Sequence, residues 1–161
     1  MNSEYRVGIG FDSHPLVDGR DLFLGGIKID YPKGLLGHSD GDVVIHSLID
    51  AFLGACSLPD IGEMFPPADN KYKDVSSLIL LKDAYSIVEK NNYIIVNADI
   101  TVIANEPEIS IFKERMKKVL IQSMNIEEDG INIKGKTPEG LTGLSDAIAS
   151  IAVVLLRKKG R

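Results

Sequence analysis

The sequence predicts an α/β (α+β) fold in which a four-stranded mixed sheet carries helices on one face only. Three observations predict it. Apolar residues alternate with small or polar ones over residues 5–12, which is the period of a strand. Apolar residues recur at helical spacing over residues 75–92. Strand-like and helical segments take turns along the chain without an internal repeat or a linker, so residues 1–161 are expected to form one domain.

The N-terminal half begins with two extended segments. The first covers residues 5–12 and is expected to end at Pro15, and the second covers residues 22–30. Residues 43–56 are apolar on nearly every side, which is typical of a buried helix, and Ser39 and Asp40 are good N-cap residues for it. The proline-rich stretch 57–74 is expected to be loop.

The C-terminal half predicts two more helices and two more strands. The helices cover residues 75–92 and 109–125, and the strands cover 93–107, ended by Pro107, and 130–137. Residues 145–159 are ambiguous, because their apolar spacing suits a helix and their β-branched run suits a strand. Helices that follow four strands in this way cover one face of a sheet, so we expect an oligomer to cover the other.

Composition excludes several classes of function. A net charge of −5 gives no basic surface for nucleic acid. No apolar run is long enough to span a membrane, and the N-terminus lacks the apolar core of a signal peptide. The single cysteine, Cys56, rules out an internal disulfide and fits a reducing compartment. We therefore expect a cytoplasmic protein.

The three histidines His14, His38 and His46 predict a metal site. Asp12 and His14 are two residues apart at the end of the first strand, so they project to the same side. Two imidazoles and one carboxylate on rigid elements suit zinc, and three protein ligands leave a fourth position open for catalysis. The third ligand is either His38 or His46, and the more rigid helix favours His46.

Two further segments predict binding of phosphate and of a second metal. Residues 38–42 lead into a helix N-terminus, whose free amides favour an anion, and His38 and Ser39 can donate hydrogen bonds to it. Thr137 and Glu139 come at the end of a predicted strand. A hydroxyl and a carboxylate there can position a phosphoryl group and a hard cation such as Mg²⁺.

Five motifs together resemble the 2-C-methyl-D-erythritol 2,4-cyclodiphosphate synthase family of the non-mevalonate isoprenoid pathway. They stand in order as "GFDSH", "GLLGHSDGDVVIH", "DIGEMFP", "DITVIANEP" and "NIKGKTPEGL". The resemblance implies a homotrimer that packs its sheets around a threefold axis, with active sites between subunits. It also implies that residues 145–159 are a strand.

The resemblance assigns a role to each matched residue. Zinc is held by Asp12, His14 and His46, and Mg²⁺ or Mn²⁺ by Glu139. His38, Thr137 and Glu139 are implied to be catalytic. The ribose is held by Asp60 and Gly62, and the cytosine is read by residues 104–110, largely through the backbone. All implied contacts to the cytidine diphosphate substrate are made by Asp12, His14, His38, Ser39, Asp60, Ile61, Gly62, Phe65, Asp69, Ala104, Pro107, Lys136, Thr137 and Glu139.

The implied reaction is an intramolecular phosphoryl transfer. The 2-phosphate of 4-diphosphocytidyl-2-C-methyl-D-erythritol 2-phosphate attacks the β-phosphorus, which closes the ring and expels CMP, so no protein nucleophile is needed. Two other interpretations compete with it. A zinc-dependent phosphate-ester hydrolase needs a general base, yet Asp40 and Asp42 look like capping residues. A structural zinc or nucleotide-binding module needs four closed ligands, which the single cysteine disfavours.

The chain departs from the family pattern in three places. Pro67 stands where an aspartate is usual, with Asp69 two residues on, and Glu108 stands where a basic residue is common. The stretch 139–149 is shorter and lacks an arginine that caps a cavity on the threefold axis in many members. Because this stretch offers no cation to meet a diphosphate, and Asp146 would repel one, we expect that this chain does not retain isoprenoid diphosphates.

Overall fold

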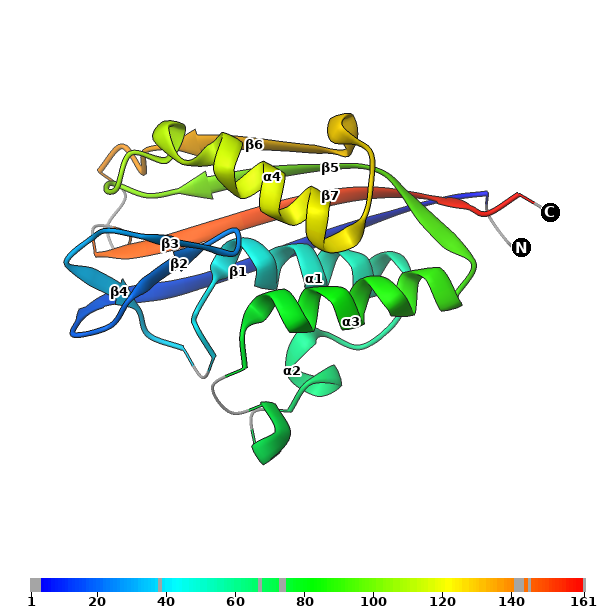
Figure 1. Cartoon of the computed structure of the whole chain (residues 1–161), viewed down its shortest axis with the longest axis horizontal. Coiled ribbons are helices and arrows are strands. Elements are labelled where there is room, and N and C mark those ends of the chain that lie inside the picture. Colours follow the sequence, from blue (N-terminus) through cyan, green and yellow to red (C-terminus); the bar gives the residue numbers. More distant parts are fainter. Residues whose placement is uncertain are drawn as a thin grey trace.

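The structure is a computed structural model that describes residues 4–37, 39–66, 68–72, 75–140, 144 and 146–160. Its main sheet has five strands rather than the predicted four, in the order β4–β1–β7–β5–β6 (Figure 1). They are β1 (Tyr5–Asp18), β4 (Lys33–Leu35), β5 (Tyr93–Ile103), β6 (Ile131–Lys136) and β7 (Ala147–Lys158). The β5–β6 pair is parallel and the other pairs are antiparallel, so the sheet is mixed as predicted. The ambiguous C-terminal segment is the strand β7, between β1 and β5.

Residues 22–30 form a separate hairpin and not a strand of the main sheet. Its strands are β2 (Leu22–Leu24) and β3 (Ile27–Ile29). Gly25 and Gly26 make the turn with φ angles of 57° and 79°, which residues without a Cβ adopt readily. The predicted single strand is wrong because these two glycines reverse the chain in its middle.

The strand β1 continues through Pro15 to Asp18, so the predicted strand end is also wrong. Pro15 is the last β1 residue paired with β7, and Leu16 is the first one paired with β4. A proline lacks the N–H donor but keeps its carbonyl. The Pro15 carbonyl accepts a hydrogen bond from the Leu36 N–H at 3.0 Å, so the proline sits at a change of partner without breaking the strand.

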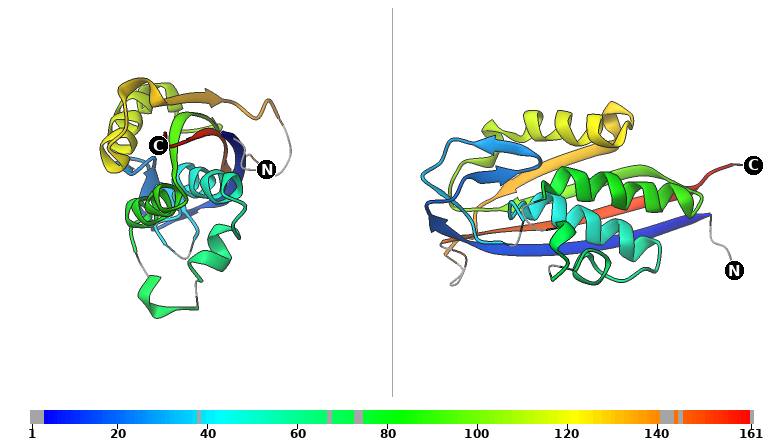
Figure 2. Two further views of the ribbon diagram at one scale, coloured as in Figure 1. Left: turned by 90° about the vertical axis from the view of Figure 1, so that its right-hand side faces the viewer. Right: turned by 60° about the horizontal axis from the view of Figure 1, so that its bottom comes forward.

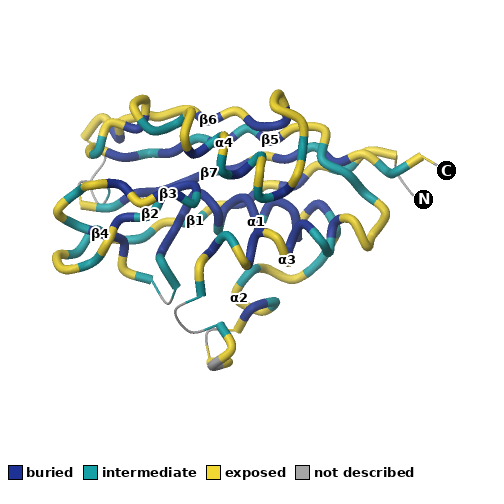
Figure 3. Tube along the Cα trace, in the orientation of Figure 1, coloured by how far each residue is buried: buried dark blue, intermediate teal, exposed yellow. Residues whose placement is uncertain are grey.

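Three long helices cover one face of the sheet, as predicted. The helix α1 (Val43–Ala55) packs on β1 and β7, α3 (Ser77–Lys90) lies beside α1, and α4 (Lys113–Met124) packs on β6. Figures 1 and 2 show all three on the same side of the curved sheet. The core lies between the two layers, and Figure 3 shows that α1 is mostly buried and that buried residues recur along β7.

Four short helices complete the described chain. They are α2 (Ile61–Met64), η1 (Asn70–Tyr72), η2 (Ile109–Ile111) and η3 (Glu128–Gly130). Two of them, α2 and η1, lie in the stretch 57–74 that was expected to be loop throughout. Among the helices that the structure describes, none combines the length and the apolar character needed to cross a membrane.

The strand β1 divides its side chains between the two faces of the sheet. Gly8 and Gly10 face α1 so closely that an added Cβ would lie 1.8 Å from the Ala51 carbonyl oxygen or 1.9 Å from that of Ser47. The helix therefore rests directly on the strand backbone. The alternating apolar residues project from the uncovered face and are 49–69% exposed: Tyr5, Val7, Ile9 and Phe11.

Candidate metal centre and active site

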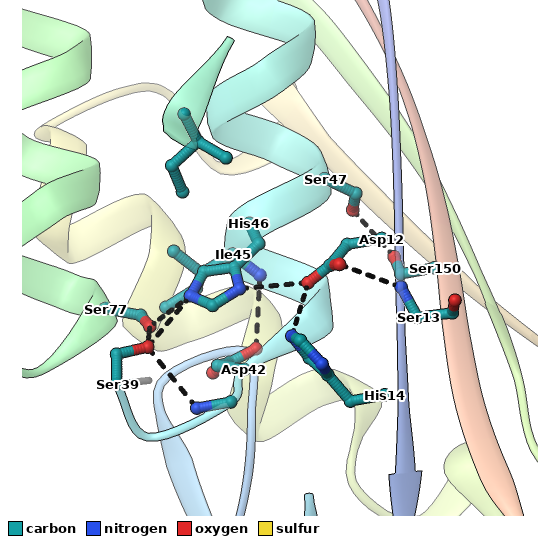
Figure 4. A network of polar contacts seen from close by, with 12 residues as sticks. Asp12, Ser13, His14, Ser39, Asp42, Ile45, His46, Ser47, Ser77 and Ser150 are labelled. Carbon is teal, nitrogen blue, oxygen red and sulfur yellow. Dashed lines mark hydrogen bonds and ion pairs between the residues drawn. The ribbon is translucent and has the colours of Figure 1, made fainter. Parts of the chain in front are cut away.

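The elements β1 and α1 bring one carboxylate and two imidazoles together. Asp12 and His14 follow Gly10 on the helix-facing side of β1, and His46 lies in the first turn of α1 (Figure 4). The Asp12 Oδ2 atom lies 2.9 Å from His46 Nδ1 and 3.2 Å from His14 Nε2. One donor atom from each of the three residues lies within 4.8 Å of the others. This close grouping is what ligands of a single metal ion require.

The cluster changes the protonation of its members. Burial by itself raises the pKa of Asp12, but hydrogen bonds with His14 and His46 outweigh it and hold that pKa well below its usual range. Burial by itself lowers the pKa of His46, but the hydrogen bond and the charge of Asp12 raise it above the ordinary 6.5. Asp12 and His46 therefore stabilise each other as a charged pair.

The other ring nitrogen of His46 faces two serines. His46 Nε2 lies 2.9 Å from Ser77 Oγ and 3.1 Å from Ser39 Oγ (Figure 4). Ser77 is the first residue of α3, is fully buried, and donates its hydroxyl hydrogen to Asp40 Oδ1. A third element, α3, thus takes part in the site.

The N-cap of α1 is Asp42, as its interpretation as a capping residue predicts, whereas the prediction that Ser39 or Asp40 caps this helix is wrong. The Asp42 Oδ1 atom accepts hydrogen bonds from the Val44 and Ile45 N–H groups, both at 3.1 Å. The helix begins at Val43, so Asp42 is the residue whose carboxylate reaches these amides.

Asp42 also joins α1 to the hairpin. Its two carboxylate oxygens accept hydrogen bonds from the Gly25 N–H at 2.9 Å and the Gly26 N–H at 2.7 Å. A buried carboxylate therefore occupies the helix N-terminus where we expected an anion to bind. The amides of Val44 and Ile45 are not available to a phosphate, and this part of the prediction is wrong.

A pocket of about 210 Å³ opens beside the three donors, and we call it the histidine pocket. Besides Asp12, His14 and His46, its lining includes four predicted substrate-binding residues: Ser39, Ile61, Gly62 and Phe65. Asp60 is the N-cap of α2 and accepts a hydrogen bond from the Glu63 N–H at 3.0 Å. Asp60 and the exposed Asp69 are not among the described residues that line this pocket. His38 lies outside the described residues.

A larger pocket of about 820 Å³ lies where β5 and β6 end, and we call it the strand-end pocket. It is lined by residues 104–110 and 134–137 with Tyr31 and Lys113, a set that includes the predicted Ala104, Pro107, Lys136 and Thr137. Glu139 is exposed and accepts a hydrogen bond from the Thr137 hydroxyl, but it is not among the described lining residues. Within the described part of the chain the two pockets share no lining residue.

Residues 5–157 match the model of the YgbB family. The chain belongs to the YgbB family. It is 51% identical over 153 residues to the 2-C-methyl-D-erythritol 2,4-cyclodiphosphate synthase of Clostridium acetobutylicum. The match covers 94% of this chain and 99% of that protein. Its structure is also similar to the IspF–CDP complex of Plasmodium falciparum, with a TM-score of 0.86, 38% identity and coverage of 99% of this chain and 100% of that chain.

A third relative is longer than this YgbB-family chain. The bifunctional IspDF of Campylobacter jejuni is similar with a TM-score of 0.92 and 39% identity over 96% of this chain. This chain spans only 42% of that bifunctional chain, whereas it spans nearly all of the Clostridium and Plasmodium proteins.

Three polar residues of this YgbB-family site are missing from the predicted set. Asp50 lies one helical turn after His46, lines the histidine pocket, and accepts a hydrogen bond from the Ile61 N–H at 2.8 Å. Burial raises the pKa of its carboxyl group. The four-residue spacing from His46 is a sequence signal for Asp50. Ser77 and Asp40 meet across 37 residues, so no local pattern indicates their contact.

The shortened C-terminal stretch is only partly described. Residues 141–143 and 145 lie outside the described residues. We expected no cation in this region to meet a diphosphate, yet Asp146 lies 3.4 Å from Lys33 Nζ of β4. That premise is wrong, because a lysine distant in sequence supplies a cation beside it.

Proposed function

We propose that this chain converts 4-diphosphocytidyl-2-C-methyl-D-erythritol 2-phosphate into 2-C-methyl-D-erythritol 2,4-cyclodiphosphate and CMP. The observation that carries the proposal is the convergence of Asp12, His14 and His46 beside a pocket. It occurs in a chain that is 51% identical to a protein named for this reaction. Both reacting groups are anionic phosphates, so the protein has to align them and neutralise their charge.

Zinc fits the donor set of Asp12, His14 and His46. Two imidazoles and a carboxylate suit this ion, and three protein ligands leave room for a substrate oxygen. Zinc bound there would polarise a phosphoryl oxygen as a Lewis acid. The contact of α1 with the backbone of β1 fixes the two elements that carry the donors. Ser39, at the same pocket, and the adjacent His38 are suited to donate hydrogen bonds to phosphate.

Glu139 is the carboxylate that we assign to Mg²⁺ or Mn²⁺. Magnesium is commonly bound by one or two carboxylates together with substrate phosphates and water, so one glutamate fits it. The hydrogen bond from Thr137 holds the two side chains together after β6. In this proposal Thr137 and Lys136 contact the transferred phosphoryl group.

The strand-end pocket is the proposed site of the cytidine. Its volume of about 820 Å³ falls in the range of small-molecule sites. The backbone of residues 104–110, including Ala104 and Pro107, is proposed to read the cytosine. The Plasmodium falciparum relative is described as a CDP complex, which supports a pocket for this nucleotide.

A homotrimer would unite the two pockets. The ribose residues Asp60 and Gly62 lie in or near the α2–η1 segment, as do the further substrate contacts Ile61, Phe65 and Asp69, whereas the cytosine residues line the other pocket. One substrate would bridge the histidine pocket of one subunit and the strand-end pocket of the next. The exposed apolar row on β1 supports this assembly, because packing the uncovered sheet faces of the subunits against one another would bury it.

The two carboxylates considered as the general base of the hydrolase alternative both bind other partners, so Asp50, which lines the histidine pocket, is the carboxylate left for that role. Asp42 is buried and accepts hydrogen bonds from four amides. Asp40 accepts hydrogen bonds from Ser77. Neither of these two carboxylates is placed to activate a water at the histidine pocket.

The test is to incubate the purified protein and a divalent metal with the cytidyl substrate, following CMP and inorganic phosphate separately. We expect CMP and the cyclic diphosphate in equal amounts, without free phosphate. Release of inorganic phosphate would support the hydrolase, and binding without turnover would support a nucleotide-binding module. A cytoplasmic location is part of the proposal and can be checked by fractionation of the source cells.

A further inference from the structure

Asp40 joins the segment before α1 to the start of α3. It binds Ser77, the residue that contacts His46 Nε2. Its Oδ2 atom accepts a hydrogen bond from the Ser77 N–H at 2.9 Å, and its Oδ1 atom accepts one from the Ser77 hydroxyl. The Asp42 N–H donates to the same Oδ1 at 3.2 Å. Asp40 therefore binds an N-terminal amide and the side chain of the first residue of α3, and it does not cap α1.

These contacts determine which nitrogen of the His46 ring carries the hydrogen when the ring is neutral, the form that binds a metal. An ionised carboxylate can only accept hydrogen bonds, so the single hydroxyl hydrogen of Ser77 is used in the bond to Asp40. Ser77 Oγ is then an acceptor toward His46 Nε2, which lies 2.9 Å away. An acceptor at this distance requires a hydrogen on Nε2.

Ser39 does not reverse this assignment. Its Oγ lies 3.1 Å from His46 Nε2 and could donate to an unprotonated nitrogen there. That arrangement would set the lone pair of Nε2 against the lone pair of Ser77 Oγ at 2.9 Å, which is repulsive. With the hydrogen on Nε2, both serines accept from the ring, and neither serine oxygen faces a lone pair on Nε2.

We propose that Ser77 and Asp40 are positioning residues that keep the hydrogen on His46 Nε2, so that Nδ1 is the atom that binds the metal. Nδ1 is the ring nitrogen that faces Asp12 Oδ2, at 2.9 Å, and Nε2 faces away from the donor cluster (Figure 4). Groups that hydrogen-bond the second nitrogen of a metal-binding histidine fix its tautomer and its ring orientation. The inference rests on the zinc site of the proposed function.

Zinc affinity in matched serine variants is the first test. Ser77→Ala removes the acceptor, so the zinc dissociation constant, measured by competition with a fluorescent chelator, should rise about 10- to 100-fold. Asp40→Asn should weaken binding in the same direction, because an amide can donate to Ser77 and turn the Ser77 hydroxyl toward Nε2. The control is Ser76→Ala at the neighbouring N-cap of α3, which accepts from the Leu78 N–H and should leave zinc affinity unchanged. Unchanged affinity in a folded Ser77→Ala protein would overturn the proposal.

The ring tautomer is the second test and requires no variant. In the zinc-loaded wild-type protein, ¹⁵N NMR of the His46 ring should show a protonated Nε2 and a metal-bound Nδ1. A metal-bound Nε2 would overturn the assignment even if Ser77→Ala fails to fold. Neither readout depends on turnover, so a protein with this tautomer that forms no CMP would contradict the proposed function and not this inference.

Discussion

At the scale of single residues, the direction of a side chain depends on the period of the element that carries it. Asp12 and His14 share the helix-facing side of β1 because they are two residues apart. His46 reaches them because it lies in the first turn of α1, the helix that packs directly on β1 at Gly8 and Gly10. This trio could be predicted from the sequence. The contact between Ser77 and the second ring nitrogen of His46 could not be predicted, because Ser77 belongs to a helix that begins 31 residues later.

His46→Ala should lower kcat/KM by at least about 100-fold and remove bound zinc while the fold persists, because it deletes one of three proposed ligands. The side chain is 12% exposed and lies at the start of α1 and not in the centre of the core. CMP release, metal analysis and circular dichroism check the three parts. Full activity, or an unchanged zinc content, would contradict the ligand assignment.

The raised pKa of His46 predicts a pH dependence for the protein after removal of metal with a chelator. The folded state holds the proton more tightly than the unfolded state, so the stabilisation is complete below the ordinary value of 6.5. This stabilisation is lost as the pH rises through the higher pKa that His46 has in the folded state. The thermal midpoint should therefore fall as the pH rises above 6.5. Asp12→Asn removes the partner that raises this pKa and should flatten the dependence, whereas an equally steep profile would contradict the pairing.

At the scale of elements, periodicity predicted the long helices and the existence of β5 and β6. It failed where a local signal competes with a tertiary one. A proline commonly marks the end of a strand. Pro15, however, sits where β1 changes its partner strand from β7 to β4, and the missing N–H donor is not needed there. Residues 145–159 were ambiguous by pattern because β7 carries apolar side chains at both alternating positions, so the period of a strand is not visible in its sequence.

Asp42→Ala should destabilise the protein by about 3 kcal/mol or more, because it leaves the first turn of α1 and two hairpin amides without acceptors. Urea denaturation measures the change. Ser76→Ala removes an N-cap from α3 that accepts one exposed hydrogen bond, and it should cost only about 1 kcal/mol. Equal losses in the two variants would show that Asp42 acts only as a cap.

At the scale of the whole molecule, the chain is divided into a covered and an uncovered face. Val7, Ile9 and Phe11 project from the uncovered face although their neighbours Gly8 and Gly10 touch α1. A monomer would leave this apolar row in water, and the two pockets of one chain share no described lining residue. Both features are explained together if the active site forms between copies.

Subunit mixing tests this assembly. His46→Ala damages the histidine pocket and Glu139→Ala the proposed metal ligand near the strand-end pocket, so each homotrimer should be inactive. If equal amounts of the two variants are unfolded together and refolded as one mixture, random trimers should recover about a quarter of wild-type activity, because one site in four combines two intact halves. Activity no greater than that of the separate variants would place both halves of the site in one subunit.

The alternation along β1 has a consequence for how this strand tolerates change. At Gly8 and Gly10 any side chain collides with the helix backbone, so a library that randomises residues 7–11 should return only glycine there. In the proposed homotrimer, the limit at positions 7, 9 and 11 is set by a neighbouring copy of the chain, and many apolar residues should be tolerated there. The number of amino acids tolerated at successive positions should therefore alternate between one and several, with a period of two residues. A selection that scores zinc binding alone should relax the odd positions further and leave the glycines fixed.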